Sequence, residues 1–94
     1  MVSTSKLIQQ LAAPGGEARQ RARDELVSRG AAAVPALTEA LGHGERDIRA
    51  GAALCLGRLH ATEAIAGLAR MAREDADPGA RPLALRALVE MAAP

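Results

Sequence analysis

Few side chains in this 94-residue chain are of types that carry out covalent chemistry, and the first of them is its single thiol, Cys55. A reactive thiolate needs a nearby cation or a helix N-terminus that lowers its pKa. Cys55 instead lies between Leu54 and Leu56 in an apolar stretch, with no Lys or His one turn away. We therefore expect Cys55 to be buried and unreactive. Because a lone cysteine cannot form an internal disulfide, it also fits a reducing compartment.

The two histidines and the serines offer no better catalytic arrangement. His43 stands between two glycines in a predicted turn, and His60 is expected at a helix end, where partial negative charge favours an imidazole. Neither has a second ligand at the spacing of a metal site, and no serine has a partnered base. The sequence thus predicts a non-enzymatic protein with no catalytic residue, no metal site and no cofactor.

The charges are balanced, with 12 basic and 11 acidic residues and a net charge of +1. Overall charge therefore does not draw the chain to nucleic acid or to an anionic membrane. A phosphate-binding patch could form from the arginines at positions 19, 21, 23 and 29. Acidic residues at 17, 24 and 25 interleave with them, and pairs three or four residues apart neutralise one another along a helix. We expect a salt-bridged, solvated face there, and neither a nucleic-acid nor a membrane partner.

The elements that position these side chains follow from the composition: 49% of the residues are hydrophobic, and none is Phe, Tyr or Trp. Such a chain favours helices packed closely through Ala and Leu, and it lacks the rings of a base-stacking platform. Apolar residues recur at helical spacing between Gly and Pro turns. This pattern predicts an all-α fold with helices near residues 4–13, 17–29, 33–41, 46–59, 62–74 and 80–92. Gly30 is expected just after the second helix, and Pro35 in the first turn of the third.

An internal repeat relates these helices to one another. The pattern Arg19-x-x-Ala22-x-x-x-Leu26 superposes on Arg49-x-x-Ala52-x-x-x-Leu56 and on Arg81-x-x-Ala84-x-x-x-Leu88, at intervals of 30 and 32 residues. A period of this length indicates a solenoid, in which helix pairs bury their apolar faces by stacking. We expect a single domain over 1–94, with small residues at 22, 52, 53 and 84 allowing close approach.

The segment from Ala33-Val34-Pro35 to Leu41, followed by Ile48-Arg49-x-x-Ala52-Ala53-x-x-Leu56-Gly57, resembles the HEAT repeat. It is most similar to the short bacterial subtype first associated with phycobilisome bilin lyases. The resemblance covers nearly the whole chain, as a half repeat, two full repeats and a half repeat. It implies a short α-α superhelix in which the helices near 4–13, 33–41 and 62–74 line the concave side.

The resemblance also implies a role for the repeated arginines at 19, 49 and 81, which would bond to acids or carbonyls in the turns. Glu17 and Asp47 precede the first two, whereas Gly79 stands at the matching place in the third repeat. Pro82 requires the last helix to begin near Gly79 or Ala80, because a proline deeper inside would break a hydrogen bond.

Two surfaces are predicted to bind partners. Aligned on the repeat, Gln9, Glu39 and Arg70 occupy equivalent positions in successive layers and would line a groove of mixed charge. The last helix would lack a pairing helix and leave Leu85, Val89 and Met91 incompletely covered, and an exposed apolar patch of this kind marks an interface. We expect a protein partner of unknown identity, a homo-oligomer, or both.

The function that these features favour is a protein–protein interaction module that binds through its concave face and its open C-terminal helix. The alternative is an accessory or lyase-like subunit acting on a chromophore-bearing or metabolic protein, which rests on the subtype resemblance. The sequence has no apolar run close to the ~20 residues of a membrane span and no apolar signal-peptide core. We therefore expect a cytoplasmic location.

Overall fold

The computed structural model describes residues 2–93, and this part of the chain contains helices and no strand. Its α-helices are α1 (Thr4–Gln10), α2 (Gly16–Ser28), α3 (Val34–Ala40), α4 (Arg46–Arg58), α5 (Ile65–Glu74) and α6 (Arg81–Ala92). Two short 3₁₀ helices, η1 (Gly30–Ala33) and η2 (Thr62–Ala64), lead into α3 and α5. The predicted all-α solenoid of six helices is confirmed.

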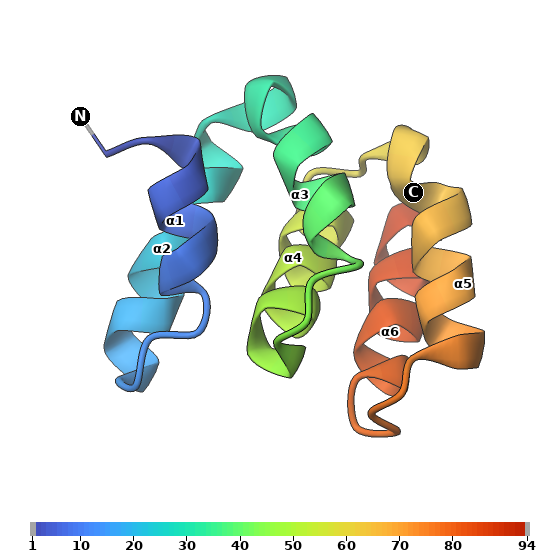
Figure 1. Ribbon diagram of the computed structural model, residues 1–94. Coiled ribbons are helices and arrows are strands. Elements are labelled where there is room, and N and C mark those ends of the chain that lie inside the picture. Colours follow the sequence, from blue (N-terminus) through green and yellow to red (C-terminus); the bar gives the residue numbers. More distant parts are fainter. Residues whose placement is uncertain (1, 94) are drawn as a thin grey trace.

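Consecutive helices pack as three antiparallel pairs, α1 with α2, α3 with α4, and α5 with α6, which stand side by side (Figure 1). This pairing differs from the expected half repeat, two full repeats and half repeat. The short turns that follow α1, α3 and α5 fold each helix directly onto its successor, and α6 packs on both α4 and α5. The expectation that the last helix lacks a pairing helix is therefore wrong.

The two layers of the solenoid differ in how closely their helices approach. In one layer α4 packs against both α2 and α6, whereas in the other α1 and α3 make fewer contacts, and α3 and α5 barely touch. The wider spacing makes α1, α3 and α5 the outer layer of the curved stack, and these helices face the viewer in Figure 1. The expectation that the segments 4–13, 33–41 and 62–74 line the concave side is therefore wrong.

Small residues explain the close approach of α4 and α6. A Cβ atom added to Gly57 would lie only 2.9 Å from the Cα and Cβ of Ala87. The predicted small residues Ala22, Ala52, Ala53 and Ala84 are all buried, as expected. Leucines fill the space between the layers, and the fully buried ones include Leu11, Leu26, Leu37, Leu56 and Leu68. The core is thus built from Ala and Leu without any ring.

The helix ends follow the local sequence. Gly30 has a φ of 62° after α2, as predicted, and His60 takes the same left-handed conformation after α4, with a φ of 50°. Pro35 lies in the first turn of α3, where the missing N–H costs no helical hydrogen bond. Pro82 is accommodated in the same way, because α6 begins at Arg81.

Candidate partner-binding surfaces

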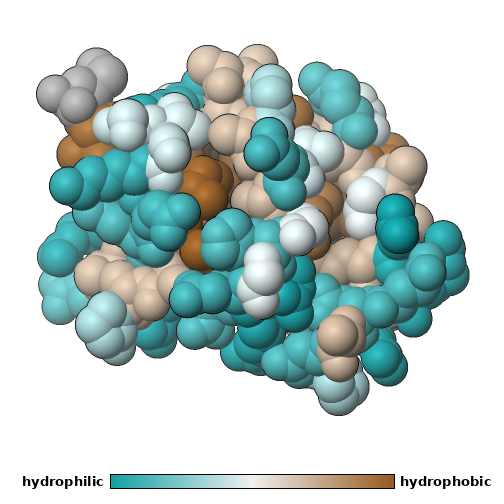
Figure 2. All heavy atoms as spheres, in the orientation of Figure 1, coloured by the Kyte–Doolittle hydropathy of each residue, from teal (hydrophilic) through white to brown (hydrophobic). Residues whose placement is uncertain are grey.

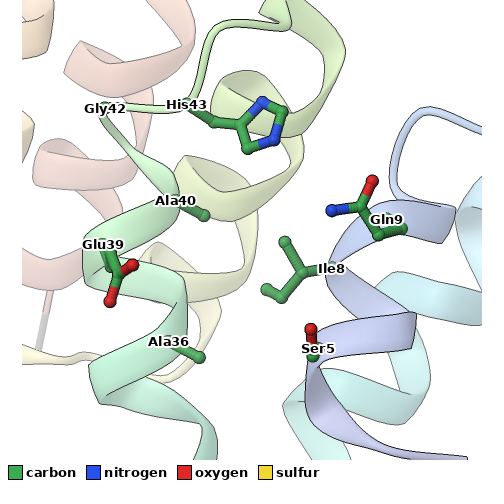
Figure 3. A pocket seen from close by; sticks show the side chains of 8 residues that line it. All are labelled: Ser5, Ile8, Gln9, Ala36, Glu39, Ala40, Gly42 and His43. Carbon is green, nitrogen blue, oxygen red and sulfur yellow. The ribbon is translucent and has the colours of Figure 1, made fainter.

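An open hollow of about 500 Å³ lies between α1 and α3. Ile8 and Gln9 of α1 face Ala36 and Ala40 of α3 across it, and His43 closes one end (Figure 3). Hydrophobic surface is visible at the bottom of this recess, with polar side chains around it (Figure 2). The wide spacing of the outer layer creates this hollow, since the two helices are too far apart for their small side chains to fill it.

A second hollow of about 550 Å³ adjoins the first, between α3 and α5. Glu39 and Gly42 line both hollows, and Glu39 projects from the flank of α3 that faces away from α1 (Figure 3). Arg70 and Glu74 supply charge on the α5 side, with 4.0 Å between the Arg70 Nε and a Glu74 carboxylate oxygen. The two hollows lie on either side of α3 and share Glu39 and Gly42, and we call them together the outer groove.

The structure brings the three predicted groove residues to the outer groove. Gln9 lines the first hollow, Arg70 lines the second and Glu39 lines both. All three are exposed, and within residues 2–93 the side chains of Gln9 and Glu39 have no hydrogen-bond partner. Their polar atoms are therefore open to a partner at little cost, because they exchange water for a new hydrogen bond.

The three predicted residues of the last helix separate into two groups. Leu85 and Val89 are 56% and 64% exposed, the highest values among the large hydrophobic residues of the described chain. Met91 is half-buried against the core, because it lies on the side of α6 that faces α4 and α5. Its part in a partner-binding surface stays a prediction, and the most exposed strip of α6 is made by Leu85 and Val89 with Pro82 and Ala92 at its ends.

The repeated arginines hold the turns that carry the helix pairs. The guanidinium of each donates to the carbonyl six residues earlier: Arg19 to Ala13 at 2.7 Å, Arg49 to His43 at 3.0 Å and Arg81 to Asp75 at 2.8 Å. The implied structural role for these residues is confirmed. The implied partners Glu17 and Asp47 pair with Arg21 and Arg46 instead.

Arg49 additionally forms a fork with Asp75 of the next helix pair, at 2.8 and 2.9 Å. Both side chains are largely buried, and the hydrogen bonds from Arg49 lower the pKa of the Asp75 carboxyl. Asp75 could not be predicted from the sequence pattern, since it lies 26 residues from Arg49 and only the stacking brings the two together. Asp75 also lines the second hollow, so this fork fixes one wall of the outer groove.

Cys55 is buried as the sequence predicted, and His43 lies in the predicted turn. Cys55 is fully buried, its thiol lies 3.8 Å from the carbonyl of Arg23, and burial raises its pKa to about 11. His43 is engaged within its turn, where Nδ1 accepts from the backbone N–H of Glu45 at 2.9 Å. The described residues contain no group of His, Cys, Asp and Glu that could hold a metal ion. No described helix has both the length and the hydrophobicity required of a membrane span.

The fold is an α-solenoid, because helix pairs are stacked on one another and a turn arginine recurs in each pair. Solenoids of this kind present extended surfaces to other molecules, and here the outer helices carry the outer groove. The model of the HEAT repeat family matches residues 4–89. The chain therefore belongs to the HEAT-repeat family. Among curated proteins, none matches it. The bilin lyase subtype stays a prediction.

Proposed function

We propose that this protein is a non-enzymatic interaction scaffold that binds a segment of another protein in the outer groove. HEAT repeats are generally protein-interaction scaffolds, and this chain is a member of that family. The observation that carries the proposal is that the two hollows adjoin each other and share Glu39 and Gly42. Two adjoining hollows that together span three helices match the length of a helix or an extended segment better than that of a small ligand.

The lining of the outer groove indicates the chemistry of that segment. The first hollow offers the apolar side chains of Ile8, Ala36 and Ala40 beside the amide of Gln9. In the second, a carboxylate on α3 and a guanidinium on α5 stand on opposite sides. A segment with small apolar residues at one end and a basic and an acidic residue towards the other would satisfy both hollows.

The experiment is a capture assay in which the immobilised chain binds proteins from an extract of the cells that make it. We expect a double charge reversal, Glu39→Lys with Arg70→Glu, to reduce the captured partner about tenfold, the effect of roughly 1.4 kcal/mol of lost and repulsive charge contacts. The melting temperature should not change, because both side chains are exposed and lie outside the core.

The matched control is Glu63→Lys with Arg73→Glu, which makes the same two charge changes at exposed positions that do not line either hollow. Capture by this control should equal that of the natural chain. If the groove variant captures as much partner as the natural chain, or if both variants lose it equally, the outer groove is not the binding site.

A further inference from the structure

We propose that two copies of this chain associate through the exposed strip of α6, with the two helices antiparallel about a twofold axis near Leu88. The inference goes beyond the proposed function, since α6 contributes no residue to the outer groove. It starts from the two largest exposed fractions among the bulky hydrophobic side chains, those of Leu85 and Val89, which lie one turn apart on the same face.

The strip differs from the face that α4 uses to receive the next helix pair. Pro82, Leu85 and Val89 stand 32 residues after Ala50, Ala53 and Gly57, which are buried where α4 packs against its neighbours. On α4 the small residues permit an approach so close that a Cβ at Gly57 would contact Ala87 at 2.9 Å. The larger side chains of α6 hold a neighbouring helix farther away, so this strip favours side chains packing between side chains over another close stack.

The strip is complementary in charge to a second copy of itself. Arg86 and Glu90 are exposed, lie one turn apart along the same edge of α6, and form no ion pair within the described chain. This edge borders α4, because a Glu90 carboxylate oxygen lies 3.0 Å from where a Cβ on Gly57 would stand. Arg86 precedes Leu88 by two residues and Glu90 follows it by two. In an antiparallel pair centred on Leu88, each Arg86 therefore faces Glu90 of the second copy.

The same alignment pairs the apolar side chains. With a rise of about 1.5 Å per residue, Leu85 lies at the height between Val89 and Ala92 of the second copy. Each leucine thus enters the gap between two smaller side chains, and the twofold axis repeats the contact. An isologous contact of this kind is the commonest arrangement in homo-oligomers.

A head-to-tail stack of two copies would lack the arginine–carboxylate contact that joins the second helix pair to the third. There, Arg49 holds the carboxylate of Asp75 in the next pair. In a head-to-tail stack, Arg81 would meet the turn of the first pair, where Ala13 occupies the place of Asp75 relative to its turn arginine. No carboxylate is available at that place. The first two pairs of the chain also stack without one, since His43 occupies the equivalent place, so the twofold arrangement is favoured by its own contacts between Arg86 and Glu90.

The test is sedimentation velocity of the purified full chain, without any partner, from about 10 µM to about 1 mM. Each copy contributes well under the roughly 20–30 residues of a stable interface, so we expect a dimer with a Kd on the order of 100 µM. Leu85→Asp should leave a monomer throughout this range. Ile65→Asp is the matched control, because Ile65 is an exposed hydrophobic residue, 45% accessible, on α5. It should dimerise as the natural chain does.

Charge reversal tests the alignment itself. Arg86→Glu alone and Glu90→Arg alone should each raise the dimer Kd about fivefold or more, since both edge contacts become repulsive. An equimolar mixture of the two variants should dimerise again, because every acidic edge then meets a basic one. Three results would overturn the proposal. The natural chain could be monomeric at about 1 mM, Leu85→Asp and Ile65→Asp could change the dimer Kd equally, or the mixture of the two charge variants could dimerise no more tightly than either variant alone. All variants are checked for an unchanged helical circular dichroism spectrum.

Discussion

The reactivity of the Cys55 thiol is determined by its burial between α4 and the backbone of α2. Its nearest polar contact is the carbonyl of Arg23 at 3.8 Å, and burial raises its pKa to about 11. Arg23 and Arg58 act in the opposite direction, towards a lower pKa, and the desolvation of the thiolate outweighs them. The fraction of Cys55 present as thiolate at neutral pH is therefore small, and the surrounding side chains keep reagents in solution away from the sulfur atom.

We predict that Cys55 in the folded chain does not react with a thiol reagent such as iodoacetamide at pH 8. The same reagent should modify it fully in a denaturant that unfolds the helices, because the thiol then regains an ordinary pKa and access. Mass spectrometry of the two samples measures the difference. Rapid modification of the folded chain would contradict the burial of this side chain.

Gly57 determines how closely α4 and α6 approach. Replacing it with alanine gains roughly 1 kcal/mol of helix propensity, but the new methyl group would lie 2.9 Å from the backbone of Ala87. The backbone cannot rotate away as a side chain can, so the helices must separate, at a cost of about 1–3 kcal/mol. We predict that Gly57→Ala lowers the free energy of unfolding by up to about 2 kcal/mol, the difference between these terms.

Gly16→Ala is the control for helix propensity, because a methyl group there would meet nothing closer than 3.6 Å, the tip of the flexible Arg19 side chain. Chemical unfolding should show Gly16→Ala to be as stable as the natural chain or more so. A stabilising effect of Gly57→Ala would mean that the two helices are less tightly packed than the structure has them.

At the scale of elements, the fork between Arg49 and Asp75 joins the second helix pair to the third. Arg49 also donates to the carbonyls of His43 and Gly44, so one guanidinium ties its own turn to the next. The Asp75 side chain is 4% exposed, and a lost partner would leave a charge away from water. This contact stabilises the stacking and, through Asp75, the second hollow.

We predict that Asp75→Asn lowers the free energy of unfolding by about 2 kcal/mol at pH 7. The folded-state pKa of Asp75 lies below its unfolded value, so the stabilisation is present above about pH 4 and is lost as the pH falls through the folded pKa. The difference between the variant and the natural chain should therefore shrink from pH 7 to pH 2. Urea unfolding of both proteins at pH 7 and at pH 2 measures this difference in the free energy of unfolding.

Glu17→Gln is the control for this prediction, since the Glu17–Arg21 pair is exposed and its two atoms are 3.5 Å apart. Its effect at pH 7 should be small. If Asp75→Asn is no more destabilising than Glu17→Gln, the fork does not join the helix pairs.

The sequence predicted the helices better than their arrangement. Apolar spacing and the positions of Gly and Pro were enough for the six helices, Gly30 and Pro35, because these depend on local geometry. Which layer lies outside depends on the distance between helices from different repeats, and Asp75 became visible only through a contact across 26 residues. The sequence also did not separate Met91 from Leu85 and Val89, since the packing of α6 on two neighbours decides how far each of its residues is covered.

At the scale of the whole molecule, the solenoid presents two separate surfaces. The outer groove is polar at its rim and crosses α1, α3 and α5, whereas the strip on α6 is apolar with one charged edge. A chain without aromatic residues lacks the commonest interface hot spots. Binding at each surface must therefore rely on small apolar contact areas together with charged contacts. This is consistent with a partner in the outer groove and with a weak dimer through α6.

The measurement that tests the outer groove most directly is photo-cross-linking from a single position inside it. A photoreactive amino acid at Gln9, which lines the first hollow, should join the chain to one discrete protein in the cells that make it. The same group at Glu63, exposed and outside both hollows, should not do so. Glu39→Lys with Arg70→Glu in the same chain should reduce the product from Gln9 about tenfold. No product from Gln9, or the same product from both positions, would contradict the account.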